Sequence, residues 1–130
     1  DKLVTGVQTC ALPICWLERY LVPQMSRDAE LVKELFAEGA VYEYGPYYPC
    51  RRGVEAIYEH HRHALSHQFE INYTWHILAV TDAFALAWFD LTLRDEQPGE
   101  PNAYQGILKI TLNADGKCTH FEEWYNVATL

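Results

Sequence analysis

LVKELFAEGAVYEYGPYYPCRRGVEAI, residues 31–57, contains the succession of helix, strand, loop and helix from which the fold can be inferred. Its first part carries an apolar stripe at helical spacing, formed by Leu31, Val32, Leu35 and Phe36. We expect Gly39 to close this helix and residues 40–44 to form a short strand. The loop GPYYPC, residues 45–50, contains one glycine and two prolines, which favour a turn. After Gly53, a third helix is expected over residues 54–68.

The flanking residues extend this pattern in both directions. Upstream, an apolar stripe predicts a first helix, formed by Trp16, Leu17, Tyr20 and Leu21. Pro23 is expected to end or kink that helix, and Ser26 to cap the next one. Downstream lie four strand-like runs, over residues 69–80, 84–95, 104–112 and 118–127, with the hairpin dipeptide Asp115-Gly116 between the last two. Helices followed by consecutive strands predict an α+β fold, in which helices pack on a curved antiparallel sheet and enclose a pocket.

Residues 1–15 are expected to be foreign to the domain. Residues 4–14, VTGVQTCALPI, match residue for residue the translation of a common sequencing-library adapter, and both flanks fit the same register. The sequence therefore predicts an adapter-derived, non-native segment over 1–15, which must be excluded from fold reasoning. The remaining residues, 16–130, are expected to form a single domain whose native N-terminus is truncated.

Composition narrows the class of protein. Apolar residues make up 49% of the chain and aromatic residues 14%, which is typical of a globular domain. The net charge of −8, without a basic tract, argues against nucleic acid and anionic membranes as partners. Outside the adapter-like segment the cysteines are Cys50 and Cys118, and no CxxC motif is present. This low cysteine content predicts a reduced, cytoplasmic protein.

Three segments carry a resemblance to a known family: residues 31–57, HILAV (76–80) and NADGKCTHFEEWYNV (113–127). They resemble the SnoaL-like group of the nuclear transport factor 2-like superfamily, over about residues 16–127. The resemblance implies a cone-shaped fold around a pocket and no cofactor. Members include ketosteroid isomerase, polyketide cyclases, scytalone dehydratase, limonene-epoxide hydrolase and non-catalytic binding domains, so a shared fold does not transfer a reaction.

Two members can be compared residue by residue. In the ketosteroid isomerase comparison, Tyr20 falls on the catalytic Tyr, Tyr44 on the base Asp and Leu108 on the second Asp. Two of the three catalytic residues are therefore absent, and steroid isomerase activity is not supported. In the scytalone dehydratase comparison, Tyr44 resembles a pocket Tyr and His76 the catalytic His, but the Tyr-Asp pair of the first helix has no clear counterpart.

Glu123 is the first candidate for catalysis. The last strand alternates, so Phe121, Glu123 and Tyr125 are expected to face the pocket. A carboxyl among aromatic rings has a raised pKa and can act as a general acid or base. The alternative is a buried Glu paired with Arg19 or Arg52 for structural reasons.

His76 is the second candidate for proton transfer. It lies on the face of its strand opposite to the apolar residues, and that face can meet the pocket, a dimer surface or solvent. Tyr20 and Tyr44 are expected to hold a ligand oxygen. Further pocket-lining residues are expected to be Trp16, Phe89, Tyr104, Leu108, Phe121 and Tyr125.

Four histidines fall on the third helix. His60, His63 and His67 share one face at metal-ligand spacing, but they lie opposite the apolar stripe, so we expect them to face water and bind no metal. His61 lies on the stripe and is expected to be a hydrogen-bonded core residue.

The sequence thus predicts a small-molecule pocket protein for a partly hydrophobic ligand. As an enzyme it would be a cofactor-free isomerase, dehydratase, cyclase or epoxide hydrolase that works by acid–base chemistry. The alternative is a non-catalytic ligand-binding or dimerisation module. Residues 84–89 are apolar on both faces, and a face that does not cover the pocket would leave a large apolar patch, so a homodimer is also expected.

Overall fold

The computed structural model describes residues 12–96 and 99–130. Its elements, in chain order, are α1 (Pro13–Ser26), the 3-10 helix η1 (Ala29–Glu34), β1 (Phe36–Tyr44), β2 (Arg51–Arg52), α2 (Val54–His67), β3 (Gln68–Val80), β4 (Ala85–Asp95), β5 (Pro101–Leu112) and β6 (Cys118–Thr129). The four long strands and the last helix confirm the predicted elements, with β5 beginning three residues earlier than expected.

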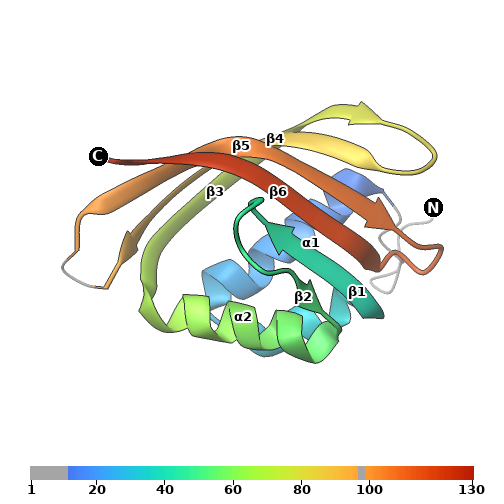
Figure 1. The fold of residues 1–130 in the computed structure, drawn as a ribbon, viewed down its shortest axis with the longest axis horizontal. Helices are drawn as coiled ribbons and strands as arrows, with labels where there is room; N and C mark the ends of the chain where they lie inside the picture. Colours follow the sequence, from blue (N-terminus) through green and yellow to red (C-terminus); the bar gives the residue numbers. More distant parts are fainter. Residues whose placement is uncertain (1–11, 97–98) are drawn as a thin grey trace.

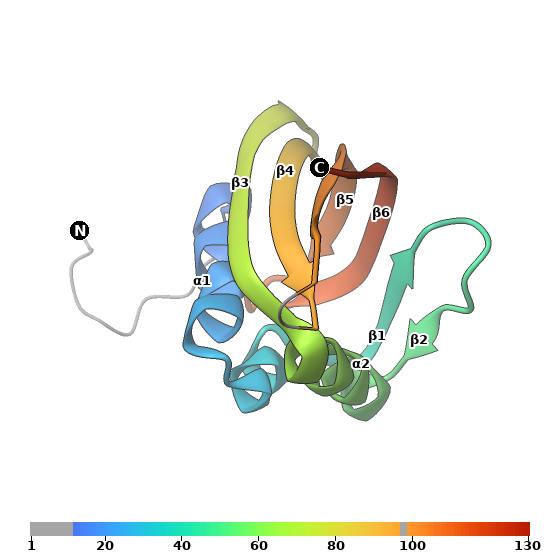
Figure 2. The same cartoon turned by 90° about the vertical axis from the view of Figure 1, so that its left-hand side faces the viewer.

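The strands form one sheet in the order β2-β1-β6-β5-β4-β3. The sheet curves strongly, and the helices lie on its concave side (Figures 1 and 2). The α+β cone-shaped architecture is therefore confirmed. The sheet is mixed and not wholly antiparallel, because β1 pairs with β6 in parallel. β1 enters the sheet from the helical layer and not from a hairpin, and the sequence gives no local signal for its direction.

Irregular pairing helps the sheet to curve. The register of β3 against β4 shifts twice, between Phe69 and Asn72 and between Ile77 and Ala79. Glu70, inside the first shift, has a φ of 53°, which marks a bulge that bends the strand. At Gly106 of β5 a Cβ atom would lie only 1.9 Å from the backbone oxygen of Trp124 on β6. Glycine is therefore required for the close approach of these two strands.

The predicted second helix is wrong in extent. Residues 29–34 form only a short 3-10 helix, and β1 already begins at Phe36, which pairs with Cys118. Gly39 lies inside β1, where the register against β6 shifts between Phe36 and Val41, and does not close a helix. Pairing with β6 overrides the local helical pattern, as tertiary context commonly does.

The first helix also differs from the expectation. α1 continues past Pro23 to Ser26 and ends at Arg27, which has a left-handed φ of 60°. Ser26 belongs to α1, and its hydroxyl donates to the carbonyl oxygen of Val22 at 2.8 Å. The residue that caps η1 is Asp28, whose carboxylate accepts a hydrogen bond from the backbone N–H of Glu30.

The core lies between α1, α2 and the concave face of the sheet. Its largest fully buried side chains are Trp16, Phe36, Phe89 and Phe121. The indole N–H of Trp16 donates to the backbone carbonyl of Leu35 at 2.9 Å, so this buried ring carries no unsatisfied donor. The ring also stacks on Tyr20, with centroids 5.1 Å apart, and thereby supports the first pocket residue.

Removal of residues 1–11 is expected to shift the melting temperature by roughly 2 °C or less. Residues 1–11 lie outside the described part of the chain, whereas Pro13 to Cys15 of the predicted segment form the start of α1. The adapter origin of residues 1–15 stays a prediction. Leu12 and Ile14 are 67% and 43% exposed, and burial begins at Trp16. Thermal denaturation of the shortened chain beside the full chain provides the test. A drop of more than about 5 °C would contradict the prediction and show that the segment contributes to packing.

Candidate functional site

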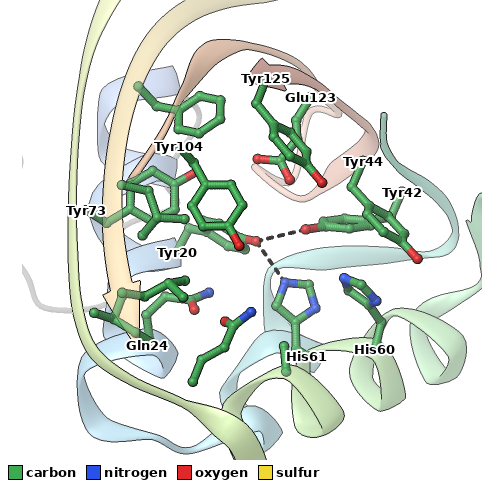
Figure 3. A pocket seen from close by; sticks show the side chains of 16 residues that line it. Tyr20, Gln24, Tyr42, Tyr44, His60, His61, Tyr73, Tyr104, Glu123 and Tyr125 are labelled. Atoms are coloured by element: carbon green, nitrogen blue, oxygen red, sulfur yellow. Dashed lines mark hydrogen bonds between the residues drawn. The ribbon is translucent and has the colours of Figure 1, made fainter. Parts of the chain in front are cut away.

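A cavity of about 200 Å³ lies between the two α-helices and the concave face of the sheet (Figure 3). Its walls come from α1, α2 and every strand except β2. Six predicted residues line it: Tyr20, Tyr44, Phe89, Tyr104, Glu123 and Tyr125. The volume is below the range typical of drug-sized ligand sites, which indicates a small ligand.

Glu123 is the acid of this cavity. Its register partners, Leu108 on β5 and Tyr44 on β1, place no cation beside it. Across residues 12–96 and 99–130, its carboxyl group has no hydrogen-bond or ion-pair partner, so the predicted alternative of pairing with Arg19 or Arg52 is wrong. Burial alone raises the pKa of Glu123 to about 8. The group is therefore mostly protonated at neutral pH, and Figure 3 shows it pointing into a ring of tyrosines.

The hydroxyl group of Tyr20 takes part in a buried chain of hydrogen bonds. The Nδ1 atom of His61 lies 2.8 Å from the carbonyl oxygen of Ile57, which can only accept, so Nδ1 carries the proton. Burial lowers the pKa of His61 to about 4, so the ring is neutral and its Nε2 accepts. The hydroxyl of Tyr20 therefore donates to Nε2 at 2.7 Å, and Tyr42 can donate to Tyr20 at 3.4 Å. The Tyr20 proton faces His61 and is not free to hold a ligand oxygen.

Tyr20→Phe is expected to lower the free energy of unfolding by about 1–3 kcal/mol, because the buried Nε2 of His61 would lose its donor. Chemical denaturation measures the change. Tyr47→Phe is the matched control, since Tyr47 is 95% exposed. Equal stability of the two variants would contradict the proposed bond between Tyr20 and His61.

Tyr73 has the free hydroxyl that Tyr20 lacks. Its side chain lines the cavity and is 9% exposed, and within the described residues its buried hydroxyl has no hydrogen-bond partner. An unsatisfied buried hydroxyl is costly in an isolated protein, but a ligand oxygen could accept its proton. Burial, with a smaller contribution from Glu123, raises the pKa of Tyr73 well above its usual value, and both side chains line the same cavity.

Tyr44 and His60 form the opposite end of the cavity. The Tyr44 hydroxyl points away from Glu123 in Figure 3 and accepts a hydrogen bond from Arg51 Nη2 at 3.1 Å. His60 packs on the Tyr44 ring, with centroids 4.5 Å apart. Burial, with smaller contributions from His61 and Arg51, lowers the pKa of His60 to about 3, so the ring is neutral. The prediction that His60 faces water is wrong, because α2 turns this residue toward β1.

Four other predicted site residues do not line the cavity. Trp16, Leu108 and Phe121 are fully buried behind its wall, where they hold the lining residues in place. His76 is exposed and pairs in register with Trp88 on the outer face of the sheet. The prediction that His76 moves a proton in the pocket is therefore wrong, because strand alternation turns it away from Tyr73.

The pocket residues that the sequence did not identify are mainly Tyr42, His60, His61 and Tyr73. Tyr42 could have been found, because it alternates with Tyr44 on one face of β1. Tyr73 alternates with Ile71 on the apolar face of β3, and both residues line the cavity. Whether the hydroxyl of Tyr73 has a hydrogen-bond partner depends on the residues that surround it in the fold, and no local sequence pattern indicates this.

A second group of ionisable residues lies on the outer face of the sheet. His120 Nε2 contacts Glu43 at 2.5 Å and Glu122 at 3.7 Å, and these three residues could together hold a metal ion. Lys109 lies 3.7 Å from Glu122 and already balances its charge. None of these three residues lines the cavity.

The family model for the SnoaL-like domain matches residues 17–121. The chain belongs to the SnoaL-like family. Comparison with curated proteins finds no significant match. Among the residues described, no helix has the length and apolar character needed to cross a membrane.

Solved structures of the nuclear transport factor 2-like fold resemble the chain at low sequence identity. SalBIII, an epoxide hydrolase/cyclase-like enzyme with a role in pyran ring formation in the polyether salinomycin, is 16% identical with a TM-score of 0.77, covering 88% of this chain and 93% of SalBIII. A computationally designed 17-OHP binder is 14% identical with a TM-score of 0.78, covering 93% and 98%. A Mycobacterium tuberculosis protein in complex with estradiol-17β-hemisuccinate is 15% identical with a TM-score of 0.76, covering 93% and 99%. At these identities the likeness shows the fold alone.

Proposed function

We propose that the protein is a cofactor-free acid–base enzyme in which Glu123 transfers a proton to and from an oxygen-bearing, partly apolar small molecule. The observation that carries this proposal is the unpaired Glu123 carboxyl group inside an aromatic cavity. An unpaired carboxyl in such a place costs free energy unless it is protonated or engages a ligand.

The protonated state of Glu123 favours reactions that begin with protonation of a ligand oxygen. In a dehydration, Glu123 donates its proton to the leaving hydroxyl as the C–O bond breaks and water departs. The carboxylate then takes the proton of the adjacent carbon as the C=C bond forms. In epoxide opening, Glu123 protonates the ring oxygen as its C–O bond breaks, and the attacking hydroxyl or water returns a proton to the carboxylate.

Tyr73 is the residue best placed to orient that oxygen. Its free hydroxyl can donate to the same oxygen that Glu123 protonates, and so stabilise charge that develops there. This role replaces the one predicted for Tyr20, whose hydroxyl donates to His61, and for Tyr44, whose hydroxyl points away from Glu123 in Figure 3.

The alternative is a ligand-binding module without turnover. It is favoured by the likeness to the designed 17-OHP binder, which has the same fold. Cytoplasmic location and a homodimer also stay predictions. The half-buried Leu86 and Trp88 lie on the face of β4 opposite to the buried Ala85 and Ala87, and these apolar side chains support the proposal of a homodimer.

The proposal is tested by incubating the protein, without added metal or cofactor, with cyclohexene oxide and with 4-hydroxy-4-phenylbutan-2-one. Product formation above the buffer rate, measured by chromatography, is the expected result for one of the two reaction classes. Binding of both probes without turnover would instead support the binding module.

A further inference from the structure

Arg51 projects to the cavity side of the sheet. It pairs in register with Tyr42, and directly paired residues point to the same face of a sheet. The neighbouring pair, Val41 with Arg52, points to the other face. Two adjacent arginines therefore lie on opposite sides of β2. Arg51 is the one on the cavity side, where it reaches the hydroxyl of the lining residue Tyr44 without lining the cavity itself.

Arg51 is a cation without a carboxylate partner. Although the chain has 18 acidic and 10 basic residues, no acidic group among the described residues lies within ion-pair distance of Arg51. Its Nη2 donates to the Tyr44 hydroxyl, while its Nε is buried and unsatisfied. A guanidinium group has five N–H donors that match a carboxylate, so most of the capacity of Arg51 is unused.

His60 lies on the other side of the same tyrosine. Its ring packs 4.5 Å from Tyr44 and 5.1 Å from Tyr42, and it lines the cavity. Neither ring nitrogen makes a hydrogen bond within the described part of the chain. The neutral ring therefore offers one free N–H donor near the guanidinium group of Arg51. Figure 3 places His60 and Tyr44 at the end of the cavity remote from Tyr73.

We propose that Arg51 and His60 form an anion subsite at the end of the cavity between β1 and α2, where they bind a carboxylate group of the ligand. The apolar body of the ligand would then lie against Phe89 and Leu91, which line the cavity on β4. The inference rests on the proposed function, because the same ligand would present its reactive oxygen to Glu123. It narrows the substrate class to small carboxylic acids with an apolar body.

The position of Glu123 is compatible with an anionic ligand. A charged carboxylate in the cavity would repel a second one in a surrounding of low polarity. The protonated Glu123 adds no negative charge, so Arg51 determines the sign of the ligand that the cavity accepts.

The test compares two probes that differ only in charge. 2-Naphthoate and 2-naphthamide have nearly the same shape, with benzoate and benzamide as a smaller pair. By titration calorimetry we expect the wild-type protein to bind the acid of at least one pair about tenfold more tightly than the amide. Arg51→Gln should remove this preference while the amide binds as before. Arg52→Gln is the matched control, with the same charge change on the opposite face, and should keep the preference.

Two results would overturn the subsite: an absence of carboxylate preference in both pairs, or a preference that persists in Arg51→Gln. Either result would indicate that the role of Arg51 is limited to its hydrogen bond with the Tyr44 hydroxyl. The melting temperature of Arg51→Gln reports whether the variant folds, and Arg51→Lys, which keeps the charge, should retain part of the preference. Glu123→Gln should bind both acids as the wild-type protein does. A loss of turnover without loss of this preference therefore concerns Glu123 alone, and the two proposals can fail separately.

Discussion

Glu123→Gln is expected to reduce turnover by about a hundredfold or more while the fold and ligand binding persist. Glutamine keeps the size of the side chain and its neutral state at pH 7, but it has no proton to transfer. The substitution therefore removes the chemistry of Glu123 and leaves the packing of the cavity nearly unchanged. The measurement is kcat on whichever probe the wild-type protein turns over, with ligand affinity measured in parallel.

Glu122→Gln is the matched control for this experiment. It makes the same chemical change at the next residue of β6, on the outer face, where Glu122 contacts Lys109 and His120. Its turnover should equal that of the wild-type protein. If Glu123→Gln retains wild-type turnover, or if it loses activity only by unfolding, Glu123 is structural and the acid–base proposal fails.

The strands could be predicted from the sequence because their signals are local. Alternation of apolar and polar residues, with turn residues at Thr81 to Ala83 and at Asp115-Gly116, located β3 to β6 to within about three residues. The same alternation correctly directed Phe121, Glu123 and Tyr125 toward the helical side of the sheet. The alternation of side chains along a strand therefore predicts which residues face the site, as well as the strand itself.

The errors arise where distant contacts override a local pattern. Phe36 fits an apolar helical stripe, but it pairs with Cys118, 82 positions later, and becomes the start of β1. The imidazole of His76 is suited to proton transfer, but it lies on the polar face of β3, which is the outer face of the sheet and not the cavity face. His60 lies opposite the apolar stripe of α2, yet Tyr42 and Tyr44 cover it from β1.

The hydrogen-bond assignments of the tyrosines could not have been predicted. Tyr20, Tyr44 and Tyr73 are chemically the same group, and their different roles depend on a neighbour supplied by another element. His61 on α2 takes the proton of Tyr20, Arg51 on β2 binds the hydroxyl of Tyr44, and Tyr73 has neither neighbour. Three-dimensional proximity therefore determines which phenol can serve a ligand.

The pH dependence of stability tests the state of Glu123 without any ligand. Its pKa rises from 4.5 in an exposed carboxyl group to about 8 in the folded protein. Between these values the unfolded chain releases a proton that the folded chain retains. Folding stability attributable to this group therefore falls as the pH rises from 4.5 to 8, by on the order of a few kcal/mol.

We expect the difference in unfolding free energy between Glu123→Gln and the wild-type protein to grow across this range in favour of the variant and to level off above pH 8. The buried His60 and His61, with lowered pKa values, destabilise the fold as the pH falls below about 6.5. They are present in both proteins, so their contribution cancels in the difference. Urea denaturation of both proteins from pH 4.5 to 9 measures this difference in unfolding free energy. Parallel stability curves over this whole range would mean that Glu123 is ionised at neutral pH like an exposed carboxylate, and it could then not serve as the acid of the cavity.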